Sequence, residues 1–125
     1  MSRRYYQVAA LLLLCVYAPV YGQADVTGTY KGSFVVQFRG SDVDIGLTLV
    51  ISAVEDGRVK GVATMGGQSC AGEYPFEGYL KGTELGIRSN VKGGRAGDCT
   101  FGMRGTLEGN RIVGTLGSYP VRLSK

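Results

Sequence analysis

The sequence predicts an all-β protein, an eight-stranded antiparallel up-and-down meander barrel with one disulfide. Three observations carry this prediction. Apolar and polar residues alternate with the period of two that half-buried strands show. Short turn signals made of glycine, aspartate and asparagine separate the alternating segments. Beyond residue 22, no segment keeps a helical apolar spacing over three turns.

The first 22 residues are expected to be a signal peptide that is removed on export. Arg3 and Arg4 give a positive start, and the apolar run from Val8 to Val16 is too short for a membrane-spanning helix. Cleavage after Gly22 leaves residues 23–125 as a single β-barrel domain. The loss of the two arginines takes the 14 basic residues to 12, against 10 acidic ones. This balance gives no support to nucleic-acid binding.

The first two strands are expected at residues 26–39 and 43–54, with a loop over residues 39–44 between them. Both strands alternate clearly and place large apolar residues on one parity. A β-bulge is predicted near Ser52-Ala53. Val54 should pair inward with Val59, and the middle of the strand needs one extra residue to keep its own apolar side chains inward.

Strands three to five are expected to follow as short segments, with a Gly-rich loop after the third strand and another after the fifth. The third covers residues 58–65, and a Gly-rich loop over 66–69 leads to Cys70. A second Gly-rich loop over 92–98, after the fifth strand, leads to Cys99. The inward side chains expected from the first, fourth and later strands include Tyr30, Phe34, Phe38, Tyr74, Phe76, Phe101 and Tyr119.

The last three strands lie within residues 100–123 and carry the clearest turn signals. A type II′ turn at Gly109-Asn110 pairs Leu107 with Ile112. A second one at Gly117-Ser118 continues the same apolar face into the eighth strand. The first and last of the eight strands run in opposite directions, so they can pair and close a barrel. An open sheet or two-sheet β-sandwich is the alternative.

Cys70 and Cys99 are the two cysteines outside the signal peptide, and an exported chain should join them in a disulfide. Their strands are separated by a third, so the bond must lie in the loops. The chain has no histidine, which removes the usual bases for serine or cysteine nucleophiles and leaves no zinc ligand set. We therefore expect no enzyme, no metal and no cofactor.

In a meander, the connections alternate between two ends, and the two ends of this chain differ. One end holds three tight turns, whereas the other holds the long connections and both cysteines. Loops on a rigid scaffold commonly carry binding. The candidate binding residues at the long-loop end are Arg39, Asp42, Asp44, Gln68, Ser69, Lys92, Arg95 and Asp98.

The stretch Val26-Thr27-Gly28-Thr29-Tyr30 resembles the first-strand motif of lipocalins and the Thr-Gly-Thr-Trp start of avidin-like proteins, with Tyr30 in the tryptophan position. Biotin binding in the avidin type depends on tryptophans, which this chain lacks. Small exported inhibitors of lysozymes and of proteases are also similar in size, disulfide and barrel architecture. No inhibitory motif of those families matches.

The sequence thus favours a periplasmic or secreted, non-enzymatic binding protein. Its long-loop end would recognise a protein or glycan of the cell envelope or medium, as an inhibitor or immunity protein does. The alternative is a carrier of a small apolar ligand in the barrel interior. A membrane-spanning barrel is not expected, because the outward parity carries many charged residues.

Overall fold

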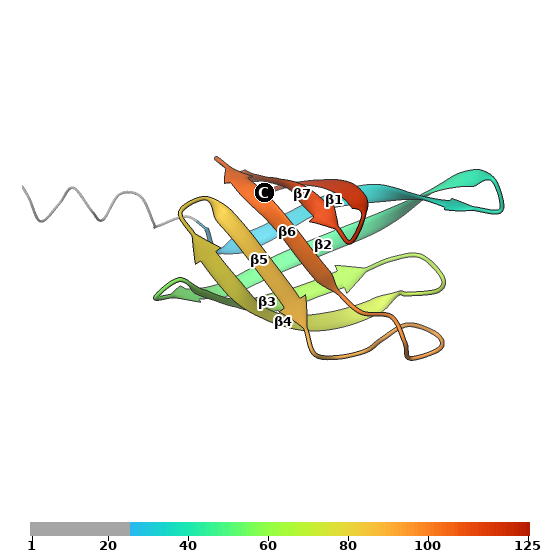
Figure 1. The fold of residues 1–125 in the computed structure, drawn as a ribbon, viewed down its shortest axis with the longest axis horizontal. Coiled ribbons are helices and arrows are strands. Elements are labelled where there is room, and N and C mark those ends of the chain that lie inside the picture. The colour runs from blue at the N-terminus through green and yellow to red at the C-terminus, as the bar shows by residue number, and fades with distance from the viewer. Residues whose placement is uncertain (1–25) are drawn as a thin grey trace, which may run out of the picture.

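Eight antiparallel strands follow one another around a closed barrel (Figure 1). The structure is a computed structural model that describes residues 26–125, so the signal peptide expected at 1–22 lies outside the described residues. The strands are β1 (Gly28–Phe38), β2 (Ser41–Glu55), β3 (Arg58–Met65), β4 (Gly72–Lys81), β5 (Glu84–Ser89), β6 (Gly102–Glu108), β7 (Arg111–Leu116) and β8 (Tyr119–Ser124).

Pairing between β1 and β8 closes the barrel, which confirms the predicted meander barrel over the two-sheet sandwich. The closing contact is short and runs from Lys31, opposite Ser124, to Ser33, opposite Arg122. Every other pair of neighbours in the chain is also a pair of neighbours in the barrel. Within residues 26–125, no helix is long and apolar enough to cross a membrane.

The two predicted turns near the C-terminus have the expected registers. Leu107 faces Ile112, and Leu116 faces Tyr119. The first turn residues, Gly109 and Gly117, have φ values of 65° and 61°, as a type II′ turn requires. These hairpins hold one apolar face toward the interior across β6, β7 and β8.

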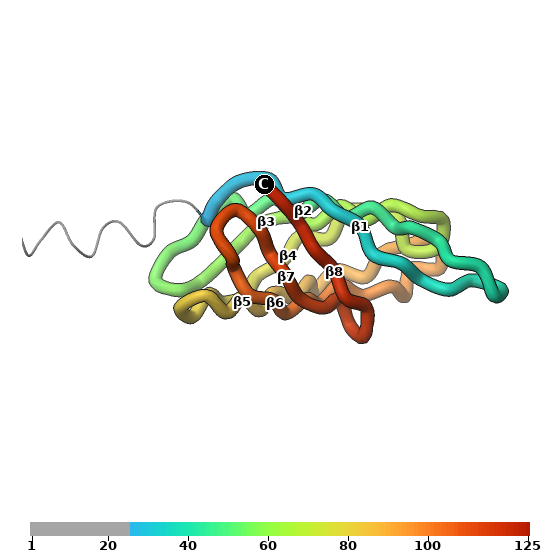
Figure 2. Tube along the Cα trace, turned by 90° about the horizontal axis from the view of Figure 1, so that it is seen from above, coloured from blue at the N-terminus to red at the C-terminus, as the bar shows by residue number. Residues whose placement is uncertain are grey.

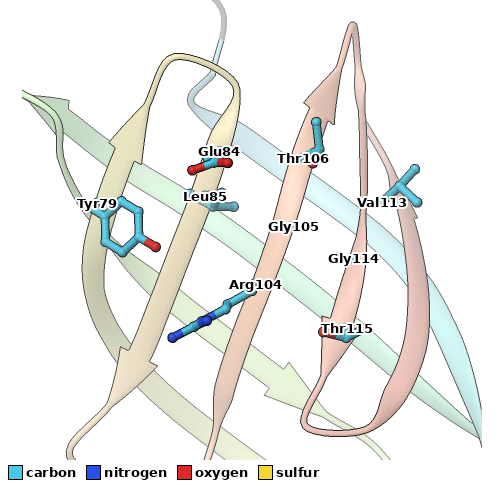
Figure 3. Close-up of a pocket in the computed structure, with 9 residues that line it drawn as sticks. All are labelled: Tyr79, Glu84, Leu85, Arg104, Gly105, Thr106, Val113, Gly114 and Thr115. Carbon is cyan, nitrogen blue, oxygen red and sulfur yellow. The ribbon is translucent and has the colours of Figure 1, made fainter.

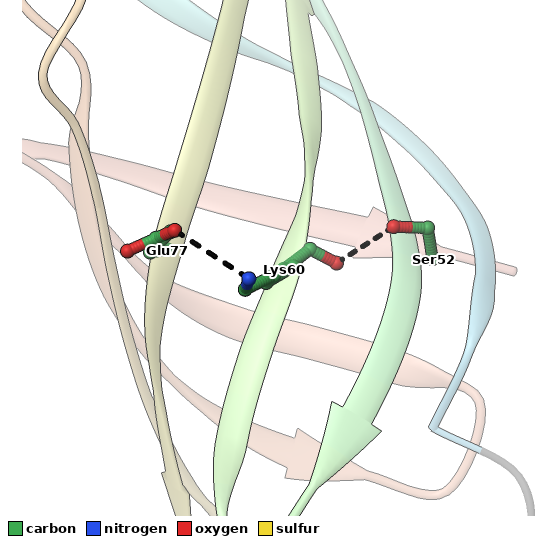
Figure 4. Close-up of polar contacts among 3 residues, drawn as sticks. All are labelled: Ser52, Lys60 and Glu77. Atoms are coloured by element: carbon green, nitrogen blue, oxygen red, sulfur yellow. Dashed lines mark hydrogen bonds and ion pairs between the residues drawn. The ribbon is translucent and has the colours of Figure 1, made fainter.

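The predicted β-bulge lies in β2 at Ser52. The pairing of β2 with β3 shifts by one residue between Ile51 and Ala53. Figure 4 shows that the Ser52 hydroxyl donates a hydrogen bond of 3.1 Å to the carbonyl of Lys60. On the same outer face, the Lys60 ammonium lies 3.8 Å from a carboxylate oxygen of Glu77, and both side chains are exposed.

A single apolar cluster fills the barrel interior. It contains 18 buried hydrophobic side chains among the described residues, and Tyr30, Tyr74 and Phe101 are the largest of those that are fully buried. Two of the expected inward side chains do not belong to it. Tyr119 is 42% exposed and Phe38 is 59% exposed, because both stand where the barrel wall has already ended.

Candidate functional site at the open end

The β1–β2 turn, the β3–β4 loop, the β5–β6 loop and the β7–β8 turn lie at one end of the barrel, called here the open end. Figure 1 shows the β1–β2 hairpin running well past the other strands at this end. The opposite end carries the three tight turns predicted there. Their central residues with positive φ are Asp56, Gly57, Gly82 and Gly109.

Residues 34–46 form a two-stranded projection, called here the arm. β1 continues past Ser33, where its pairing with β8 stops, and β2 begins before Leu47, where its pairing with β3 starts. Figure 2 shows from a second direction that this ribbon projects beyond the barrel. Within the arm, β1 and β2 therefore pair only with each other, and β8 and β3 flank them only at the base of the arm.

Pro120 explains why the pairing of β1 with β8 stops. Continuing the register by two residues would place Val35 opposite Pro120. Leu116 and Tyr119 flank a two-residue turn, and their backbone N–H and C=O groups hydrogen-bond to each other. Because these groups alternate in direction along a strand, the backbone nitrogen of Pro120 points away from β7 and toward β1. Proline has no N–H to donate at that point, and the ladder ends.

The arm has one apolar and one polar face. Phe34, Val36 and Phe38 share a face with Val43 and Ile45 through the β1–β2 register. Phe34 remains buried and packs near Tyr119, with ring centroids 5.9 Å apart. Farther out, Val43 is 37% exposed and Phe38 is 59% exposed. The face that is core inside the barrel thus continues into solvent as an apolar surface.

The predicted loop over residues 39–44 is wrong. Arg39 and Gly40 alone form the turn, and their φ values of 55° and 80° match a type I′ hairpin turn. Asp42 and Asp44 belong to β2, where they face Gln37 and Val35. Because the parity of the strand is unbroken, both carboxylates lie on the polar face of the arm, and Asp42 accepts a 3.3 Å hydrogen bond from the Gln37 amide.

Arg39 is the outermost charged residue of the arm. Its guanidinium carbon lies 5.3 Å from the centroid of the Phe38 ring, a cation–π arrangement at an exposed site. The tip therefore combines an aromatic ring with a positive charge. Sequence reasoning selected Arg39 for its place near a turn but assigned Phe38 to the core.

The β3–β4 loop and the β5–β6 loop are joined by the predicted disulfide. Cys70 and Cys99 are linked with their Cα atoms 5.6 Å apart, and both lie outside the strands. The backbone N–H of Arg95 also donates to the carbonyl of Ser69 at 2.9 Å. A pair of backbone hydrogen bonds between Gly93 and Cys99 closes the neck of the β5–β6 loop. The two loops thus form one tied unit.

Tyr74 holds this unit to the core. Its hydroxyl donates a 2.6 Å hydrogen bond to the carbonyl of Cys70, and its ring lies 6.2 Å from that of Phe101. A Cβ at Gly93 would come within 2.9 Å of the same ring, so the β5–β6 loop lies directly against it. Burial raises the pKa of the Tyr74 hydroxyl above its ordinary value.

The remaining candidate residues lie in the two tied loops. Gln68 and Ser69 are in the β3–β4 loop, and Lys92, Arg95 and Asp98 are in the β5–β6 loop. All five side chains are exposed. Within the part of the chain that the structure describes, no three potential metal ligands of the His, Cys, Asp or Glu type come together.

A shallow depression on the outer wall is a second candidate surface. It crosses β4 to β7 and is lined by Tyr79, Glu84, Leu85, Arg104, Gly105, Thr106, Val113, Gly114 and Thr115 (Figure 3). Tyr79 is 48% exposed, but a Cβ at Gly86 on the neighbouring strand would come within 2.5 Å of its ring. The Tyr79 ring therefore covers the backbone at Gly86, where β5 has no side chain of its own. This packing gives Tyr79 a structural role.

Comparisons with family models, with curated proteins and with solved structures found no match for this chain.

Proposed function

We propose that this chain is an exported, non-enzymatic binding protein that recognises a protein partner through the open end of the barrel. The observation that carries the proposal is the arm, whose apolar face leaves the core at the partly buried Val36 and stands in solvent at Phe38 and Val43. A contiguous exposed apolar surface commonly marks an interaction site. Its protruding shape suits a concave surface on the partner.

The tied loops support the same end as the binding end. They present Gln68, Lys92, Arg95 and Asp98 as exposed polar groups on a backbone held by a disulfide. A rigid polar rim beside an apolar anchor is the usual composition of a protein interface. The disulfide is also compatible with the oxidising compartment that export would provide.

The filled interior gives the carrier hypothesis no support. The inward glycines approach a neighbouring strand closely and do not mark an empty volume. An added Cβ at Gly61 would lie 1.9 Å from the carbonyl oxygen of Val50, and one at Gly78 would lie 1.9 Å from that of Gly86. We therefore place recognition on the outside of the barrel.

Site-specific photocrosslinking in the producing cell tests the proposal. A photoreactive phenylalanine analogue replaces Phe38 in one variant and Tyr79 in another, because both side chains are aromatic and about half exposed. We expect a discrete crosslinked protein from position 38 and none from position 79. The same adduct should disappear when Val36 and Val43 are both changed to serine.

Equal crosslinking from the two positions would contradict the proposal. So would recovery of the same partner, in the same yield, by the unmodified protein and by a Phe38→Ser variant. Because Phe38 is exposed, the free energy of unfolding of this variant should lie within about 0.5 kcal/mol of that of the unmodified protein. Its unfolding curve in urea shows whether a lost partner reflects lost binding or lost structure.

A further inference from the structure

The two edges of the arm expose backbone hydrogen-bonding groups. Phe38 and Ser41 flank the two-residue turn, so their N–H and C=O groups point at each other. Along β1 the groups that point away from β2 are therefore those of Val35 and Gln37. The 2.9 Å hydrogen bond from Gly66 to the carbonyl of Gly46 confirms the same alternation on β2, where Gly46 points outward.

The two edges differ in charge. The outward groups of β2 belong to Asp42 and Asp44, and antiparallel pairing of this edge with its own copy would oppose these carboxylates. Charged residues on an edge are a known protection against such pairing. On the β1 edge, the residues whose backbone groups point outward are Val35 and Gln37, and both are neutral. Pro120 keeps β8 from covering this edge. It is the unprotected edge of the arm.

We propose that the β1 edge pairs with the β1 edge of a second copy of this chain, antiparallel, about a twofold axis at Gln37. Gln37 of each copy then donates its N–H to the carbonyl of the other Gln37. On the apolar face, Val36 of one copy lies beside Phe38 of the other. A C2 contact of this kind is self-complementary and closed, so it stops at a dimer.

Charge complementarity favours a second copy over an unrelated strand. In this register Arg39 of one copy lies opposite Val35 of the other, and Val35 is the cross-strand neighbour of Asp44. The Arg39 side chain leaves the Phe38 ring and reaches over the small valine to the carboxylate. Two such pairs of opposite charge form in the dimer, one on each side of the axis.

Edge pairing leaves both faces of the arm open. The two apolar faces join into one surface of four strands, which suits the proposed binding role but does not depend on it. The contact is small, because only a few residues of each arm take part, and small interfaces give weak association. The dimer should therefore depend on protein concentration.

Analytical ultracentrifugation of the purified protein, from about 10 µM to about 1 mM as a small interface requires, tests the proposal by charge exchange. Arg39→Asp and Asp44→Arg should each weaken dimerisation at least about tenfold by placing like charges together. The double variant Arg39→Asp/Asp44→Arg should restore it. Arg104→Asp, a matched reversal on the outer wall, should leave it unchanged.

Amide hydrogen exchange supplies a second measurement on the same samples. The Gln37 amide should gain protection as the dimer forms, whereas the Asp42 amide should not. A protein that stays monomeric at the highest concentration overturns the proposal. So does a dimer that both single charge variants leave intact, or a double variant that is no better than the single ones.

Discussion

At the scale of single residues, close approach between strands matters as much as side-chain burial. Gly61 faces the barrel interior, and its Cα lies so near β2 that an added Cβ would be 1.9 Å from the Val50 carbonyl oxygen. That obstacle is backbone, which cannot turn aside as a side chain can. Gly32 and Gly114 approach their neighbouring strands in the same way. These glycines allow eight strands to close tightly around a filled core.

Gly61→Ala should therefore destabilise the barrel, although alanine is the smallest possible change. We expect a loss at the upper end of the range of about 1–3 kcal/mol that overpacking costs. Urea unfolding followed by circular dichroism measures it. Gly102→Ala is the matched control, since nothing lies within 4 Å of its added Cβ, and it should change stability by less than about 0.5 kcal/mol. Equal effects of the two changes would refute the packing argument.

Phe34 and Phe38 show what the residue pattern could and could not predict. Both stand on the inward parity of β1, so the sequence assigned both to the core. Phe34 is 5% exposed and Phe38 is 59% exposed. Parity gives the direction of a side chain relative to its strand, but it does not give the point at which the neighbouring strands stop. The exposed apolar part of the site, at Phe38, was missed for this reason.

At the scale of elements, the arm arises from unequal strand lengths. β1 and β2 contain 11 and 15 residues, whereas β7 and β8 contain 6 each. A strand belongs to the barrel wall only where it pairs with a neighbour on both sides. The parts of β1 and β2 that extend past their neighbours must therefore project beyond the wall. This inequality was present in the sequence, but the assumed loop over residues 39–44 hid it. Recognising Arg39-Gly40 as a two-residue turn would have revealed the arm.

Pro120→Val should lengthen the pairing of β8 with β1. The new N–H points toward Val35 and can donate to its carbonyl, which adds one hydrogen bond of about 0.5–1.5 kcal/mol. Hydrogen exchange should show a protected amide at position 120, together with a higher urea midpoint. The same change should weaken the proposed dimer, because β8 would then cover part of the β1 edge. An unprotected amide at position 120 would show that proline does not limit the ladder.

At the scale of the whole molecule, closure and the open end are separate features. The order of the strands, the registers of the hairpins at the predicted two-residue turns and the bulge at Ser52 followed from period-two alternation and turn chemistry, which are local signals. The shape of the open end depends on where pairing stops and on how two loops of different strands meet. Those contacts are long-range, and local alternation does not encode them.

The disulfide therefore should stabilise the open end without being required for the barrel. Replacing Cys70 and Cys99 by serine removes a link across a sequence separation of 29 residues. The chain-entropy model gives a loss of about 3–4 kcal/mol for a loop of this length. We expect the variant to fold, because the closing pairs of β1 with β8 lie outside the closed loop. Its urea midpoint should fall, and the Arg95 amide, which donates to Ser69, should lose its protection from exchange.

The pattern of exchange distinguishes this expectation from general unfolding. In β1 and β8, protection of amides such as that of Gly32 should fall only by as much as the free energy of global unfolding falls. The amides of Gly93 and Cys99 should lose more protection than that. The unmodified protein under a thiol reductant should reproduce the variant. A uniform loss of protection over the whole barrel would mean that the two loops and the wall form one cooperative unit. In that case the open end could not rearrange on binding without unfolding the barrel.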